Sequence, residues 1–159
     1  MKKKKLITVA IDSPAAAGAG TQAKLIAKSY NLFKLDTGMI YRLIGNMRLK
    51  KLKKFNYTSI KKKIKNLKIH ELRNKNLLSD KVAISASIVA KDKKIRNIVH
   101  KFQKNCAYNP PKKYAGSVLD GRDITSVILK DAMFKFYITA NINVRAKRRF
   151  KEYKSLNKA

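Results

Sequence analysis

The segment "LITVAIDSPAAAGAGTQAKLI", residues 6–26, constrains the fold of this 159-residue chain more than any other. Its first part, residues 6–12, is a short β-branched apolar run, typical of a strand buried on both faces of a parallel sheet. A loop rich in Gly and Ala follows at 13–20, and "TQAKLIAKSY" then has helical composition. A strand, a Gly-containing loop and a helix in this order predict an α/β domain with a phosphate-binding loop at the helix N-terminus.

The loop lacks the lysine expected of such a loop. In the pattern G-x-x-x-x-G-K the lysine reaches the β- and γ-phosphates, and here its position is Ala19. Gly18 and Gly20 still allow a tight turn and close approach of backbone N–H groups to phosphate oxygens. Loss of a comparable electrostatic contact costs about 3–4 kcal/mol of transition-state stabilisation. We therefore predict slow catalysis with partly retained binding, and expect Ala19→Lys to raise turnover at least about tenfold unless another cation has taken over.

Short apolar runs predict three further strands, at 32–36, 116–121 and 134–140. Helical spacing predicts a helix from Thr37, another from Ser79 or Asp80, one with Ile95 to Cys106 on its apolar face, and a last one at 144–156. Residues 50–70 carry nine lysines around a thin apolar stripe of Ile60, Ile64 and Leu67, which favours a surface helix over an RNA-binding patch. Strands that alternate with helices indicate an α/β fold with a parallel sheet and right-handed crossovers.

Four of the nine acidic residues lie at the carboxyl ends of predicted strands: Asp12, Asp36, Asp120 and Asp123. Open α/β sheets bind their ligands at this edge. In "LDTGMIYR", 35–42, Asp36 can accept a hydrogen bond from a sugar hydroxyl, and Arg42 has the planar fork that binds phosphate. "LDGRDIT" offers Arg122 and Asp123 in the same arrangement. We interpret this edge as a nucleotide site.

The formal charge of +30 suggests an anionic partner, but its origin weakens that inference. Lys outnumbers Arg 31 to 8 and the lysines are spread along the chain, as an AT-rich genome produces at neutral surface positions. No aromatic-rich platform for nucleic acid accompanies them. A basic nucleic-acid-binding module therefore stays an alternative, and we expect no nucleic-acid partner.

Cysteine content and the N-terminus bear on the compartment. The single cysteine, Cys106, permits no internal disulfide and fits a reducing compartment. "MKKKK" is like the basic start of a secretory signal, but the apolar run that follows reaches Asp12 after six residues, too short for export or a membrane span. We expect a cytoplasmic monomer without a membrane partner.

Taken together, these motifs resemble the cytidylate kinases, a branch of the nucleoside monophosphate kinases. The family's "IDGPAGSGKGT"-like loop corresponds to "IDSPAAAGAGT" here, and its "LDTGxxYR" and "DGRD" are matched at 35–42 and 120–123. The stretches 85–103 and 138–152 are similar to the family's Ala-Ser-x-x-Ala segment and to its strand with an Arg-rich helix. The resemblance spans nearly the whole chain and implies a P-loop kinase fold of three layers with a parallel sheet.

The resemblance also implies an activity, the transfer of the ATP γ-phosphate to CMP or dCMP. ATP would be bound by the loop residues Ser13, Pro14, Ala15, Ala16, Ala17, Gly18, Ala19, Gly20 and Thr21. CMP or dCMP would be bound by Asp36, Arg42, Ser87, Arg96, Arg122 and Asp123. Charge in the transition state would be neutralised by Arg122, Arg42 and Arg148, and by Mg²⁺ held mainly by the ATP phosphates with no direct protein ligand.

Three loop residues depart from the family's pattern. Ser13, Ala16 and Ala19 replace a glycine, a glycine or small residue, and the lysine. We expect Ala16 to be tolerated and Ser13 to crowd a tight turn. Because of Ala19, a catalytically impaired relative that only binds nucleotide is the main alternative to a kinase. The cations that could replace the lysine are Arg122, Arg145, Arg148 and Arg149.

The resemblance also sets expectations for domain organisation. We expect a single kinase domain over 1–159, with a core of 1–42 and 112–159 and a nucleotide-binding appendage at about 43–111. The chain stops in the helix after the fourth predicted strand, so the family's lid and last strand are expected to be missing by C-terminal truncation. The run "FKFYITA" would then be an exposed apolar edge.

Overall fold

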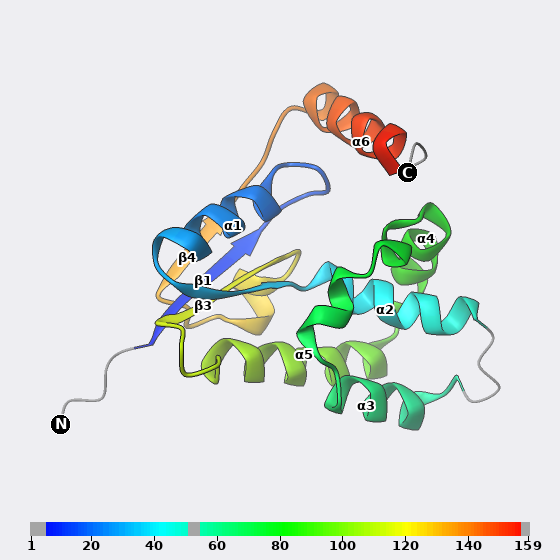
Figure 1. Ribbon diagram of the computed structural model, residues 1–159, viewed down its shortest axis with the longest axis horizontal. Coiled ribbons are helices and arrows are strands. Elements are labelled where there is room, and N and C mark those ends of the chain that lie inside the picture. The colour runs from blue at the N-terminus through cyan, green and yellow to red at the C-terminus, as the bar shows by residue number, and fades with distance from the viewer. Residues whose placement is uncertain (1–5, 51–54, 157–159) are drawn as a thin grey trace. The chain divides into compact units, whose positions relative to one another are not determined.

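The computed structural model describes residues 6–50 and 55–156 of the chain. The chain divides into two compact units (Figure 1). One unit comprises the residues up to Asp36 together with those from Lys104 onward, and the other comprises Thr37–Gln103. No helix among the described residues is long and apolar enough to cross a membrane.

The first unit is built on a four-stranded sheet. Its strands are β1 (Ile7–Asp12), β2 (Leu32–Asp36), β3 (Gly116–Gly121) and β4 (Phe134–Tyr137). Their order is β2-β3-β1-β4 and all three pairings are parallel, which confirms the predicted α/β class with a parallel sheet. The fourth strand is shorter than expected from 134–140, although the N–H of Ile138 still donates to the carbonyl of Asp12 at 2.9 Å.

Helices cover both faces of this sheet. Alternate residues of a strand point to opposite faces of the sheet, so the side chains of Ser117 and Val118 in β3 contact different helices. Val118 packs with Val9 and with Ala23 of α1 (Ala19–Ser29) in one apolar cluster. On the other face the Ser117 hydroxyl donates to the carbonyl of Ala107, near the end of α5 (Lys93–Tyr108), at 2.8 Å. The predicted three-layer arrangement is therefore present within this unit.

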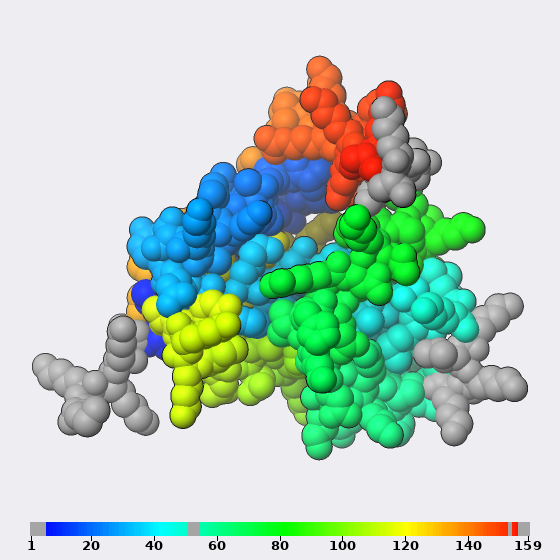
Figure 2. Space-filling model, viewed as in Figure 1, coloured from blue at the N-terminus to red at the C-terminus, as the bar shows by residue number. Residues whose placement is uncertain are grey.

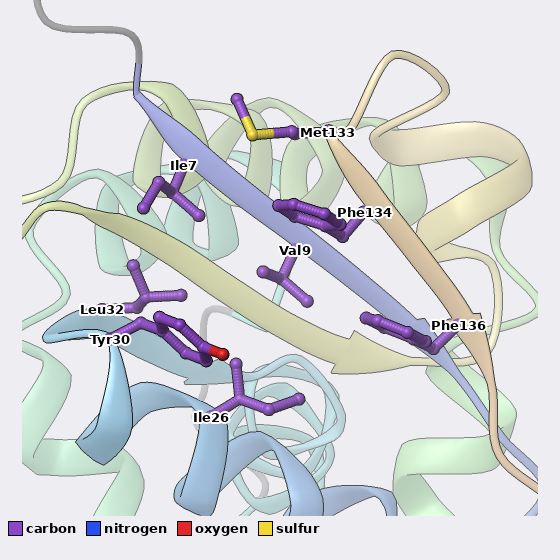
Figure 3. A pocket seen from close by; sticks show the side chains of 8 residues that line it. All are labelled: Ile7, Val9, Ile26, Tyr30, Leu32, Met133, Phe134 and Phe136. Atoms are coloured by element: carbon purple, nitrogen blue, oxygen red, sulfur yellow. The ribbon is translucent and has the colours of Figure 1, made fainter.

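β4 forms an apolar edge, as the sequence predicted. The side chains of Phe134 and Phe136 remain 49% and 46% exposed. They point to the same side of the sheet as Val9 and face Ile26 of α1 and Tyr30, the residue after α1 (Figure 3). Between them lies a groove of about 450 Å³ that is almost entirely apolar.

The second unit is helical. It contains α2 (Gly38–Leu49), α3 (Tyr57–Lys65), the short 3₁₀ turns η1 (Ile69–Arg73) and η2 (Lys75–Leu78), α4 (Asp80–Val89) and the first part of α5. The predicted start of α4 is confirmed, because the Ser79 hydroxyl caps it by accepting from the N–H of Val82 at 3.4 Å. The lysine-rich surface helix is α3, which buries Ile60 and Ile64; part of the predicted 50–70 stretch, 51–54, lies outside the described residues.

Close packing of α2 on α4 requires Gly45. A Cβ on Gly45 would lie 2.6 Å from the backbone nitrogen of Ala86. The Ser85 hydroxyl also donates to the Gly45 carbonyl at 2.9 Å, so the two helix backbones approach at this point.

The last helix of the first unit is α6 (Ile142–Leu156), which begins two residues earlier than predicted. The Asn141 side chain accepts a hydrogen bond from the N–H of Asn143 at 2.9 Å, at the start of this helix.

Candidate nucleotide site

The loop between β1 and α1 has a backbone suited to anions. Ala16 and Gly18 have φ of +59° and +104°, and Gly18 is the N-cap of α1. Left-handed residues alternating with right-handed ones turn successive N–H groups toward a common concave side. The first N–H groups of α1 add to it, because they have no acceptor within the helix. The backbone conformation of this loop is therefore of a kind that suits an anionic group.

Strain in the loop falls on a different residue than expected. Among the described residues, the non-glycine positions with positive φ are Ala16 and Asn31, so the turn at Ser13 accommodates a side chain. The N–H of Ser13 donates to the carbonyl of Gly121 at 3.0 Å, in line with β1 and β3. Ala16 instead occupies a conformation that costs an L-residue about 1–2 kcal/mol. The backbone cost therefore lies at Ala16 and not at Ser13, and the effect of either residue on activity stays a prediction.

Two arginines of α6 lie on the loop. Arg148 Nη1 donates to the carbonyls of Ala17 at 3.0 Å and Ala16 at 3.4 Å. Arg145 Nε donates to the carbonyl of Ala15 at 2.8 Å. Figure 2 shows the orange atoms of α6 against the blue segment between β1 and α1. α6 thus brings positive charge to a loop that has no lysine of its own.

Asp120 lies where β3 meets the start of α1. The residue is 7% exposed, and Oδ2 is 3.7 Å from the point where a Cβ on Gly20 would lie. Burial and the charge of Asp36, its register partner on β2, raise the pKa of Asp120 to about 6, while Lys34 acts against them. Lys34 Nζ lies 3.5 Å from Asp120 Oδ1. Lys34, Asp36 and Asp120 make a partly buried charge cluster at the carboxyl ends of β2 and β3.

Lys34 was missed by the sequence interpretation. Lys34 and Asp36 are two residues apart on β2 and therefore point to the same face. The signal in the sequence is a lysine within an otherwise apolar strand, two positions before Asp36. Such a lysine could have indicated a cationic partner for Asp36 and Asp120.

Asp12 supports the segment after "DGRD". It is 5% exposed, and its carboxylate accepts from the N–H of Ile124 at 2.6 Å and of Thr125 at 3.1 Å. These two residues begin the π-helical turn η3 (Ile124–Ile128), and the Thr125 hydroxyl also donates to Asp12. Asp12 is one of the four acids predicted at the ligand edge, and its carboxylate binds backbone N–H groups of the segment after "DGRD".

Arg122 and Asp123 lie on the turn that Asp12 holds. Arg122 is exposed and Asp123 is half-buried. The carbonyl of Asp123 accepts from the N–H groups of Val127 and Ile128 at 3.1 and 3.2 Å, so it forms part of the η3 backbone. The loop residues 13–21, Asp36 and these two residues all belong to the first unit.

The other predicted substrate residues belong to the second unit. Arg42 Nη1 donates to the carbonyl of Leu77 at 2.8 Å, which orients the guanidinium along η2. The Ser87 hydroxyl is exposed and donates to the carbonyl of Ile84 at 2.7 Å. Arg96 is half-buried in the first turn of α5. Their roles in substrate binding stay predictions.

The carboxylate of Asp120 is relevant to metal binding. Among the described residues there is no group of three or more His, Cys, Asp or Glu side chains placed to hold a metal ion. Asp120 is a carboxylate that faces the start of α1, where phosphate would bind. One carboxylate together with phosphate oxygens is a usual ligand set of Mg²⁺, so these residues fit a magnesium ion bound mainly through a nucleotide.

A parallel sheet whose first strand leads through a Gly-containing loop into a helix N-terminus is the arrangement of P-loop proteins within the α/β class. The family model for cytidylate kinase matches residues 9–159. The cytidylate kinases of Bartonella bacilliformis and Bartonella tribocorum are each 41% identical to the chain, over 145 and 149 residues, covering 91% and 93% of it and 66% and 67% of the relative. The Clostridium botulinum (strain Hall) cytidylate kinase is 37% identical over 159 residues, covering 93% of the chain and 71% of the relative. The chain belongs to the cytidylate kinase family and spans about two thirds of the length of these curated relatives.

Proposed function

We propose that the protein transfers the γ-phosphate of ATP to CMP or dCMP, giving ADP and CDP or dCDP. The observation that carries this proposal is the loop backbone at 13–20, whose left-handed residues and helix N-terminus suit phosphate, next to the "DGRD" turn. Membership of the cytidylate kinase family supports it.

The proposed roles follow the two ends of the reaction. The loop Ser13–Thr21 binds the ATP phosphates through its backbone. CMP or dCMP is bound by the predicted set Asp36, Arg42, Ser87, Arg96, Arg122 and Asp123. The acceptor is an anionic phosphate oxygen, so the reaction needs no general base. Positioning and charge neutralisation carry the catalysis, with Arg42, Arg122 and Arg148 as the proposed cations.

Magnesium belongs to this proposal as a cofactor. When bound, it neutralises negative charge on the transferred phosphate. Asp120 would face it from β3, and the phosphates of ATP would supply most of its ligands. Lys34 favours the ionised form of Asp120, because its ammonium lies 3.5 Å from Oδ1 and lowers a pKa that burial and Asp36 raise.

A nucleotide-binding protein without efficient transfer is the second candidate. Ala19 favours it, because this position lacks the cation, and so does the strained Ala16. A monomeric state, a cytoplasmic location and the absence of nucleic-acid and membrane partners stay predictions from composition.

The test is a coupled assay of ADP formation with CMP, dCMP and UMP as acceptors, together with calorimetric titration of CMP and ATP. We expect transfer to CMP and dCMP, and loss of about 100-fold or more in kcat for Arg122→Gln. Arg73→Gln, an exposed arginine of η1, is the matched control and should leave kcat unchanged. Binding of both nucleotides without transfer would select the second candidate. RNA affinity that CMP does not displace would instead revive the nucleic-acid module.

A further inference from the structure

Position 19 carries no cation and faces the core. Ala19 is 5% exposed and belongs to the apolar cluster of Val9, Ile11 and Ala23. Backbone N–H groups remain for phosphate, but they are fixed dipoles. A mobile positive charge on the β- and γ-phosphates has to come from another element.

Arg148 is placed to supply this charge. Its Nη1 lies 3.0 Å from the Ala17 carbonyl and 3.4 Å from the position of a Cβ on Gly18, the residue directly before Ala19. Both hydrogen bonds of Arg148 to the loop are donated by Nη1. A guanidinium has five N–H donors in a planar fork that matches phosphate, so the other donors of Arg148 take no part in these two bonds. Arg148 as a whole is also exposed, so a nucleotide at the loop could reach its side chain.

Two of the other candidate arginines, and the lysine of α1 that lies nearest in sequence to position 19, are placed less well. Arg149 Nη1 lies 2.9 Å from Glu152 Oε2 on its own helix. Arg145 donates through Nε to Ala15, four residues before position 19. Lys24 is an exposed residue of α1, five residues beyond Ala19 and therefore about 7 Å along the helix axis.

We propose that Arg148 replaces the missing loop lysine, reaching the β- and γ-phosphates of bound ATP from α6. Arg145 acts as a positioning residue, because its bond to Ala15 fixes α6 on the loop. The proposal rests on the proposed function and deepens it. It also changes the expectation for Ala19→Lys: with Arg148 in place, the added lysine should alter kcat by less than about threefold.

The test is a double-mutant cycle on kcat with four proteins: the native chain, Arg148→Met, Ala19→Lys and the double variant. We expect Arg148→Met to lower kcat by about 100-fold or more in the native background and by less than about fivefold in the Ala19→Lys background, where the loop has regained its own cation. Lys147→Met, an exposed neighbour on α6, is the control and should leave kcat unchanged. An equal loss in both backgrounds, or no loss in the native one, would overturn the proposal.

Affinity for ATP separates this proposal from the proposed function. Arg148→Met should weaken ATP binding by about tenfold in calorimetry and leave CMP binding unchanged. That readout decides the matter even if no acceptor is phosphorylated. If Ala19→Lys does not fold, Arg148→Lys takes its place in the comparison. A charge without the fork should keep kcat within about tenfold of native, and a loss as large as that of Arg148→Met would count against a cationic role.

Discussion

The carboxylate of Asp12 accepts two hydrogen bonds from Thr125, one from its backbone N–H at 3.1 Å and one from its hydroxyl. Asp12 ends β1 and directly precedes the phosphate loop, while Thr125 follows the "DGRD" turn at the end of β3. One buried side chain thus ties together two loops that are 113 residues apart in sequence. The spacing between the proposed phosphate and substrate residues of the first unit depends on it.

Asp12→Asn should destabilise the protein. An amide has one oxygen to accept hydrogen bonds, and its NH₂ group would face the N–H of Ile124 or Thr125. We expect a loss of about 1–3 kcal/mol in the free energy of unfolding, measured by urea denaturation, and weaker CMP binding. Thr125→Val removes the hydroxyl alone and should cost about 1 kcal/mol. A fully stable Asp12→Asn protein would show that the carboxylate is dispensable.

Ala16→Gly should stabilise the protein. Glycine adopts φ near +59° without the steric cost that alanine carries there, although it loses more backbone entropy on folding. The balance predicts a gain of up to about 1 kcal/mol in the free energy of unfolding. Ala17→Gly is the matched control, because Ala17 is buried and outside the positive-φ residues, and it should destabilise. The same sign for both changes would contradict the assignment of strain to Ala16.

The charge cluster around Asp120 should make stability depend on pH. A carboxyl with a pKa of about 6 in the folded state and about 3.9 in the unfolded chain binds protons more tightly when folded. Its contribution to stability is present below about pH 4 and is lost as pH rises through about 6. Relative to Asp120→Asn, the native protein should lose on the order of 2–3 kcal/mol between pH 4 and pH 7.

Asp131 is the control for this measurement. The hydroxyl of Tyr108 donates to Asp131 and holds the pKa of that carboxyl below its usual value. The native protein should therefore gain stability relative to Asp131→Asn as pH rises. Parallel pH curves for both comparisons would rule out the charge cluster around Asp120 as the cause.

Local sequence patterns predicted the strands and the acidic residues at strand ends, because these depend on composition over a few residues, while ligand binding at this edge stays a prediction. The β-branched run of β1, the acids at the ends of β2 and β3, and the exposed Phe134 and Phe136 are features of this kind. The strain at Ala16 could not be predicted, because a loop's φ angles are set by how its two ends are anchored. Arg148 was one of several arginines that could replace the loop lysine. Its contact with the carbonyl of Ala17, 131 residues away in sequence, distinguishes it from the others, and such a contact cannot be predicted from local sequence.

Gly45→Ala should separate α2 from α4. The added methyl group would lie 2.6 Å from the Ala86 nitrogen, a backbone atom that cannot move aside as a side chain does. The helices must shift, and the Ser85 hydroxyl would lose its bond to the Gly45 carbonyl. We expect a loss of about 1–3 kcal/mol in the free energy of unfolding, from overpacking, although alanine has the higher helix propensity. Gly38→Ala, at the exposed first residue of α2, should be close to neutral; if Gly45→Ala is equally mild, the close approach of the two helices is not needed for stability.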